Sequence, residues 1–182
     1  ITGKTVKFVG TTNDATINLG SVARTAANSK LTFVNLTLIK SNDLYKGFHH
    51  VAEETYINCN IKGMFWAYGS TANFEGCTFE QTDSNAYNIW TYGADVINFK
   101  NCTFNSGGRS MLVYNEGGSA DPSYINIRNC TFNATQAVKD KAAIEIDSTY
   151  NSYVVNIDDS TATGFSNGNI SGNSLWNHKL GK

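Results

Sequence analysis

The chain has 182 residues, of which 12% are aromatic and 16% charged, with 16 glycines and a single proline. Its 14 Lys and Arg nearly balance its 15 Asp and Glu, which leaves a net charge of −1. This excludes the broad basic surface typical of nucleic-acid or anionic-membrane binding, and no apolar run is long enough to span a bilayer. We therefore expect no nucleic-acid partner, no membrane insertion and one β-rich domain over residues 1–182.

In chain order, residues 5–9 are expected to end an incomplete first coil, and residues 16–20 to begin the next. One motif then recurs, most clearly as VINFKNCTF at 96–104, with related copies at 32–38, 55–61, 73–79, 126–132 and 156–162. The motif position held by Leu36, Cys59, Cys77, Cys102, Cys130 and Ser160 recurs at spacings of 23, 18, 25, 28 and 30 residues. Self-similarity at that period predicts a solenoid.

Each copy reads as two short strands joined at a one-residue corner. In the clearest copy, Ile97 and Phe99 alternate with polar residues, and Cys102 and Phe104 do so after the corner. Asn101 stands between them, a residue type that tolerates the left-handed conformation. A third strand is predicted upstream of the motif, at 48–51, 66–69, 90–93, 112–115 and 144–147. The result is about seven three-strand coils.

Two long insertions, 116–123 and 134–141, interrupt the repeat, and 134–139 is compatible with one helical turn. Residues 171–182 lose the motif, and we interpret them as a cap, with Leu175 and Trp176 closing the core, or as the start of a linker. Residues 1–4 do not read as a signal peptide, so we interpret the chain as a domain excised from a larger protein.

The repeat resembles the right-handed parallel β-helix of the pectate-lyase-like superfamily, whose coils carry stacked asparagines at this bend. On that resemblance, Asn35, Asn58, Asn101 and Asn129 form a ladder, with Gly76 and Asp159 as substitutes. The resemblance covers roughly residues 5–172. It implies an all-β, single-stranded solenoid, but it does not fix an activity, because the superfamily includes bacterial surface proteins, adhesins and polysaccharide-processing enzymes.

The four cysteines share one motif position, which Leu36 fills in an earlier coil. A site that accepts Leu is an inward packing site, and free Cys is among the most buried residue types. We expect a ladder of reduced, buried thiols rather than disulfides, because stacked neighbours about 4.7–4.9 Å apart exceed the preferred Cβ separation of about 3.8 Å. A linear ladder does not converge on one centre, so we expect no metal and no cofactor.

Five Asn-x-Ser/Thr sequences match the glycosylation pattern, and those at Asn35, Asn101 and Asn129 begin at the corner. We interpret these three as a by-product of the motif, on the premise that a corner asparagine is buried and cannot carry a glycan.

The third strands carry large apolar residues at both parities. The aliphatic terminal coil, with Glu145 between Ile144 and Ile146, favours the aromatic parity as core, which leaves Phe65, Ile89 and Met111 as the contact face. A local slip would instead expose the other set as a flat aromatic platform: Trp66, Tyr68, Trp90, Tyr92 and Tyr114. In both cases an apolar outer face remains, and such a patch marks a contact site.

Catalytic signals are weaker. Superfamily lyases use a basic residue beside acidic calcium ligands, and charged residues do flank the third strands: Lys62, Arg109 and Lys141 before them, and Asp95, Glu116, Asp121 and Asp147 after them. His49 and His50 form a pair in which we expect one packed and one solvated ring. No nucleophile elbow, phosphate loop or zinc spacing occurs in the sequence.

Two functions follow as expectations. The first is a non-enzymatic, extracellular or cell-surface domain of a bacterial protein, adhesin-like or carbohydrate-binding, whose partner is a glycan or a host protein surface. The second is a polysaccharide lyase or glycoside hydrolase. The low charge and abundant Asn, Thr, Ser and Gly favour the extracellular setting.

Overall fold

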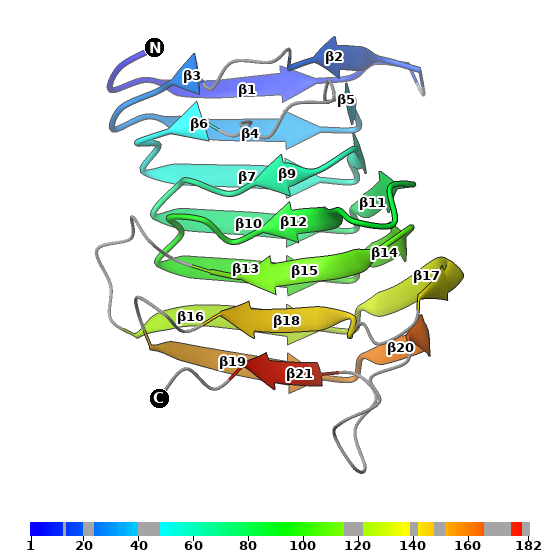
Figure 1. Ribbon diagram of the computed structural model, residues 1–182. Helices are drawn as coiled ribbons and strands as arrows, with labels where there is room; N and C mark the ends of the chain where they lie inside the picture. Colours follow the sequence, from blue (N-terminus) through cyan, green and yellow to red (C-terminus); the bar gives the residue numbers. More distant parts are fainter. Residues whose placement is uncertain are drawn as a thin grey trace.

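The computed structural model describes residues 1–12, 14–19, 24–39, 48–114, 122–138, 142–147, 152–165 and 176–179; for 24–25, 48–49, 137–138, 147 and 176–179 it describes the backbone alone. These residues contain strands and no helix, so none of their elements is a helix that could cross a membrane. The chain is a right-handed parallel β-helix. In Figure 1 the first-sheet strands run left to right behind the third-sheet strands, which run back to the left as the chain descends, the hand that parallel crossovers favour.

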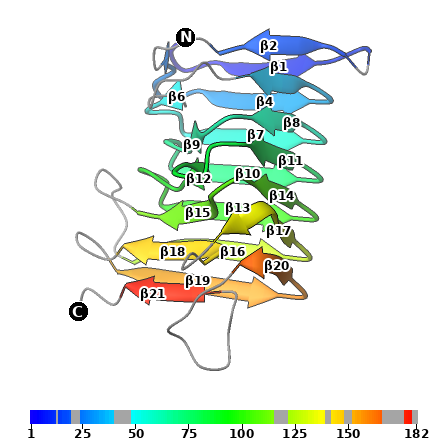
Figure 2. The ribbon, with the colours of Figure 1, turned by 45° about the vertical axis from the view of Figure 1, so that its right-hand side comes forward.

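Three sheets of parallel strands form the faces of the coil (Figures 1 and 2). The first sheet contains β1 (Thr5–Val9), β4 (Lys30–Val34), β7 (Glu53–Ile57), β10 (Thr71–Glu75), β13 (Val96–Lys100), β16 (Ser123–Arg128) and β19 (Tyr153–Asp158). The second contains β2 (Thr16–Asn18), β5 (Thr37–Ile39), β8 (Asn60–Lys62), β11 (Thr78–Gln81), β14 (Thr103–Ser106), β17 (Thr131–Val138) and β20 (Thr161–Phe165).

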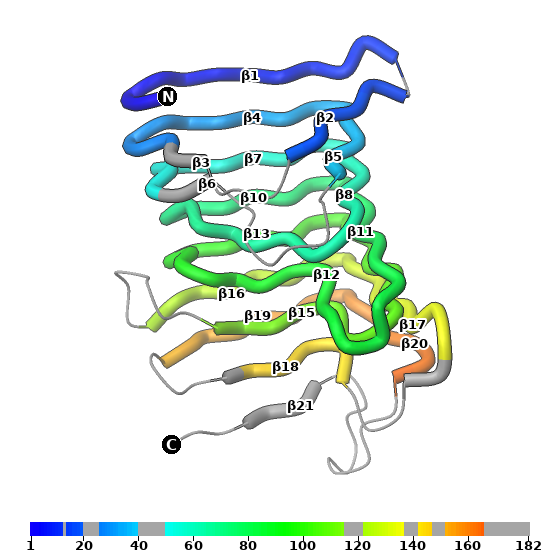
Figure 3. The backbone as a smooth tube through the Cα atoms, turned by 45° about the horizontal axis from the view of Figure 1, so that its top comes forward, coloured from blue at the N-terminus to red at the C-terminus, as the bar shows by residue number. Residues whose placement is uncertain are grey.

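The third sheet contains β9 (Phe65–Trp66), β12 (Tyr87–Trp90), β15 (Arg109–Val113), β18 (Ile144–Asp147) and β21 (Trp176–Lys179). A short sheet of β3 (Arg24–Thr25) and β6 (Phe48–His49) occupies the equivalent place near the N-terminus. Figure 3, tilted toward the N-terminal end, shows each coil passing through these faces in turn. The repeat in the sequence is therefore the repeat of the coil.

Period-two alternation fills the interior. On β13, Ile97 and Phe99 are at most 1% exposed, whereas Asn98 and Lys100 face outward. Aromatic rings stack on one another inside: Phe8, Phe33, Tyr56, Phe74 and Phe99 follow one another at 4.7–5.1 Å between ring centroids. A second stack joins Phe79, Phe104 and Phe132 at 4.5–4.6 Å. Aromatic side chains stacked in register thus form two rows of the core.

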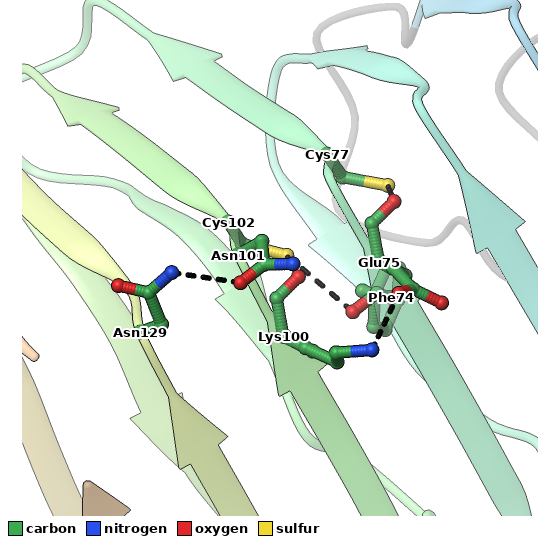
Figure 4. A network of polar contacts seen from close by, with 7 residues as sticks. All are labelled: Phe74, Glu75, Cys77, Lys100, Asn101, Cys102 and Asn129. Carbon is green, nitrogen blue, oxygen red and sulfur yellow. Dashed lines mark hydrogen bonds and ion pairs between the residues drawn. The ribbon is translucent and has the colours of Figure 1, made fainter. Parts of the chain in front are cut away.

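The corner residues adopt the left-handed conformation, as predicted. Their φ angles are +54° at Asn35, +50° at Asn58, +63° at Gly76, +55° at Asn101, +50° at Asn129 and +46° at Asp159. The Asn129 amide donates to Asn101 Oδ1 at 2.8 Å (Figure 4). The premise that these asparagines are buried is wrong, because Asn35, Asn101 and Asn129 are exposed. Burial therefore does not argue against their sequons; the motif is explained by the backbone conformation that each corner requires.

The prediction for the cysteines is confirmed: Cys59, Cys77, Cys102 and Cys130 are free and buried. Cys102 Sγ lies 3.4 Å from the carbonyl oxygens of Phe74 and Lys100, both visible in Figure 4. Phe104 and Phe132 follow on the same inward side, each fully buried.

Three details differ from expectation. Residues 5–9 begin a coil instead of ending an incomplete one, because β1 lies in the first sheet and β2 follows it in the second. Residues 134–138 continue β17 as a strand instead of forming a helical turn, and Thr135 and Gln136 donate side-chain hydrogen bonds to the carbonyls of Ser106 and Gly107. The preceding coil thus supplies acceptors that hold the segment extended. Within 171–182, β21 pairs with β18 and adds a strand to the third sheet. Leu175 lies outside the described residues, as does the side chain of Trp176.

Candidate functional site

The third sheet decides which parity faces outward. Its inward row is Phe65, Ile89, Met111 and Ile144, each at most 1% exposed and part of the core. The alternative contact face of Phe65, Ile89 and Met111 is therefore wrong. The row that includes Trp66, Trp90, Leu112 and Glu145 lies on the outer side. The terminal coil with Ile144 and Ile146 predicted the wrong inward row. Its Ile144 pairs with Met111, whereas the comparison of the repeats placed it beside Leu112.

Six rings gather on this outer side and form what we call the aromatic cluster: Trp66, Tyr68, Tyr87, Trp90, Tyr92 and Tyr114. Trp66 stacks on Trp90 at 4.6 Å with 7° between planes, and Tyr92 stacks on Tyr114 at 5.5 Å. Trp66 also lies 4.9 Å from Tyr92, and Tyr68 meets Tyr92 edge-on at 5.0 Å. The five predicted rings thus lie together, and Tyr87 joins them through an edge contact with Trp90 at 5.8 Å.

The cluster is not a flat platform. Stacking along the coil axis turns the faces of Trp66 and Trp90 toward each other, and Trp66 is only 5% exposed. The other five rings are half-buried and form the more accessible part: Tyr68, Tyr87, Trp90, Tyr92 and Tyr114. A ligand would therefore meet mainly the tyrosines of the cluster.

An ion pair borders the cluster. Arg109 Nε lies 2.6 Å from Glu145 Oε2, and the Tyr87 hydroxyl donates to the same oxygen at 3.0 Å. The Arg109 guanidinium also lies over the Tyr87 ring, 5.4 Å from its centroid. The Glu145 side chain is 7% exposed and that of Arg109 28%. Glu145 and the Tyr87 ring thus fix the orientation of Arg109 at the border of the cluster.

Comparisons with protein families, curated proteins and solved structures found no match for this chain.

A buried carboxyl group lies behind the cluster. Glu54 is fully buried in β7, in an inward row whose neighbours are Leu31 and Ala72. Its Oε1 accepts the backbone N–H groups of Tyr68 at 3.2 Å and Gly69 at 3.0 Å, and its Oε2 accepts the Tyr56 hydroxyl at 2.7 Å. Burial raises the pKa of Glu54 to about 7, although these three donors act in the opposite direction.

The sequence analysis missed Tyr87, the Glu145 pairing and Glu54. A glutamate at an inward position of the first-sheet strand, where other coils have Leu, Ala or Ile, was the signal that would have identified Glu54. Tyr87 is the first residue of β12, two positions before the inward Ile89. Alternation along the strand therefore predicts an inward ring at Tyr87, although its ring lies outside.

The charged residues named from the sequence do not all converge. Arg109 joins Glu145, while Lys62 pairs with Glu80 on the second sheet at 3.6 Å. Lys141, Glu116 and Asp121 lie outside the described residues, as do the side chains of Asp147 and His49; His50 is exposed. Within the described ranges, no three His, Cys, Asp or Glu side chains are grouped to hold a metal ion.

Proposed function

We propose that this chain is a non-enzymatic, extracellular β-helix domain that binds a glycan through the aromatic cluster on the outer face of its third sheet. The observation that carries the proposal is the gathering of six aromatic rings on the outer side of the third sheet. The outer faces of the other two sheets carry mostly Thr, Asn and charged residues, with single exposed apolar side chains such as Val9, Ile39 and Tyr124. Tyrosines suit sugars because the ring packs against C–H groups while the hydroxyl forms hydrogen bonds. Placement in the pectate-lyase-like superfamily belongs to the same proposal.

A protein surface is the other partner that an aromatic face suits. The glycan is favoured because tyrosines, rather than aliphatic residues, form the accessible part of the cluster, and Arg109 adds donors at its border.

A glycan array probed with the purified chain tests the proposal, followed by titration of the best ligand. Tyr92→Phe and Tyr114→Phe remove hydroxyls while keeping ring packing, and each should weaken binding about 5- to 10-fold, the loss of one hydrogen bond. Tyr124→Phe is the matched control, because Tyr124 is 43% exposed on the first sheet, away from the cluster. If all three variants bind as the native chain does, the cluster is not the site.

The enzymatic alternative rests on Arg109, the cation beside the cluster. A lyase needs a basic residue that is free to reach the substrate, whereas Arg109 Nε is held 2.6 Å from Glu145 Oε2. We therefore favour binding over catalysis. An assay for unsaturated products and new reducing ends on the array's best ligand decides between them, since any turnover lost in Arg109→Lys supports the lyase.

A further inference from the structure

We propose that Glu54 is a positioning residue of the aromatic cluster: from inside the coil it holds the turn that carries Tyr68, and loss of its proton loosens that turn. This inference rests on the proposed function, since it concerns the regulation of the same site.

The side chain of Glu54 links the core directly to the turn at Tyr68 and Gly69. Glu54 Oε1 binds the N–H groups of Tyr68 and Gly69, so a single oxygen fixes two successive peptide units of the turn. The Tyr68 ring contacts Trp66 at 5.9 Å and Tyr92 at 5.0 Å, and Gly93 packs against Tyr68 from the next coil. A shift of the turn therefore moves the ring that closes one side of the cluster.

The fit around Glu54 is tight. A Cβ at Gly69 would lie 3.1 Å from Glu54 Cγ and 3.1 Å from Val51 Cγ1, so glycine is the residue that lets this turn approach the carboxyl group. In the next coil, Ala72 takes the place of Glu54 in the first-sheet row. The carboxyl group thus replaces an apolar side chain at one coil, where the cluster begins.

No cation balances Glu54 among the described residues. β4 brings Leu31 to it and β10 brings Ala72, neither of which titrates; the groups that do titrate nearby are Tyr56, with Cys59 and Cys77 next to that ring. Glu53 faces outward and pairs with Lys30 at 3.0 Å, and His50 is exposed. Ionisation therefore places inside the coil a charge that no cation balances. The three hydrogen-bond donors offset only part of the cost of its burial, so the charge favours any opening that lets water reach it.

Linkage gives the size of the effect. The group has a pKa of about 7 when closed and 4.5 when exposed, so ionisation multiplies the opening constant of the turn by up to about 300-fold. The opening constant should be low below pH 4.5, rise between pH 4.5 and 7, and level off above.

Hydrogen exchange of the Tyr68 and Gly69 amides tests this without a ligand. Protection, corrected for intrinsic exchange, should fall by roughly 100-fold between pH 4.5 and 8, while the Ala94 amide, which donates to the Thr91 carbonyl in the equivalent turn of the next coil, should stay level. Glu54→Gln should remove the pH dependence. Glu75→Gln is the control, an exposed carboxylate that pairs with Lys100 at 2.7 Å.

Protection of Tyr68 and Gly69 that stays level from pH 4.5 to 8 in the native chain overturns the proposal, even if Glu54→Gln does not fold. Ligand binding separates it from the proposed function. If exchange responds to pH but no glycan binds, the proposed function fails while the turn mechanism stands. If a glycan binds with the same affinity at pH 5.5 and 8 despite the exchange response, Glu54 does not position the site.

Discussion

At the scale of single residues, the left-handed corners set the geometry of each coil. Asparagine tolerates positive φ better than other residues with a Cβ, and glycine adopts it without steric cost. Gly76 interrupts the ladder, and the space that its side chain would occupy is taken by Asn58 Oδ1, 2.4 Å from an ideal Cβ. Since that atom ends a rotatable side chain, Asn58 can yield.

Two replacements of Gly76 separate the strain of a side chain at this corner from the contribution of hydrogen bonds along the asparagine ladder. Gly76→Ala should destabilise the fold by about 1 kcal/mol, because alanine is strained at φ +63° and brings no hydrogen bond. Gly76→Asn should recover most of that loss by joining Asn58 and Asn101. Urea unfolding of the two variants measures the difference, and an asparagine variant no more stable than the alanine one would contradict the ladder's contribution.

The thiol ladder gives a second prediction at this scale. All four thiols are at most 2% exposed, so a reagent in solution does not reach them in the folded chain, although hydrogen bonds along the ladder lower the pKa of Cys59 and Cys102 and raise that of Cys77 and Cys130. Native protein should therefore react slowly with a thiol reagent, and all four thiols should react in denaturant. Rapid reaction of one or more thiols in the native state would show that the ladder is accessible.

Serine replacement at Cys102 should cost little. Ser160 occupies the same position in the last coil, where its hydroxyl donates to the Asp158 carbonyl at 2.9 Å. Cys102→Ser has the equivalent Lys100 carbonyl available, so we expect a loss of about 1 kcal/mol, at the low end for a buried hydroxyl. Thermal and urea unfolding check the value; a loss above about 3 kcal/mol would mean that the hydroxyl finds no acceptor.

At the scale of elements, the third sheet separates a packed inward face from the outward face that we propose as the binding site, within strands as short as β9. Phe65 packs edge-on against Tyr56 at 5.4 Å and against Phe74 at 6.0 Å, so it belongs to the core of the first sheet as well. Trp66, one residue later, packs against Tyr68, Trp90 and Tyr92 of the aromatic cluster.

Alanine substitutions on this sheet should follow that division. Phe65→Ala should cost about 3–5 kcal/mol, as for large cavities in packed cores. Tyr92→Ala should cost less, because its ring is half-buried, while affecting ligand binding more. Denaturant unfolding and ligand titration on the same preparations test the pair; equal losses of stability would place Tyr92 in the core.

At the scale of the whole molecule, each coil buries residues of its neighbours. The ionisation of the buried Glu54 therefore affects the free energy of unfolding of the whole chain. Glu54 is protonated in the folded chain up to a pKa of about 7, whereas the unfolded chain loses that proton near 4.5. The stabilisation is thus fully present below pH 4.5 and lost as pH rises to 7. The free energy of unfolding should fall by up to about 3 kcal/mol over this range.

Unfolding curves at pH 4.5, 5.5, 6.5 and 7.5 measure this slope, with Glu54→Gln as the variant that should lack it. Other carboxylates add their own dependence, so the difference between native and variant chains is the quantity to compare. A native slope that matches the variant's would show that the folded pKa of Glu54 is near its ordinary value.

The sequence by itself determined the coil. The recurring motif fixed the first two sheets, the corner asparagines and the buried thiols, because in-register stacking requires the same residue type at the same place in every coil. Only the tertiary structure decided the third sheet. The corner between the second and third sheets differs in length from coil to coil, so the parity of β9, β12 and β15 cannot be counted from the motif, and a slip of one residue exchanges core and surface. For the same reason the contacts of Glu54 with Tyr68, and of Arg109 with Glu145, join residues whose distance in the sequence carries no signal.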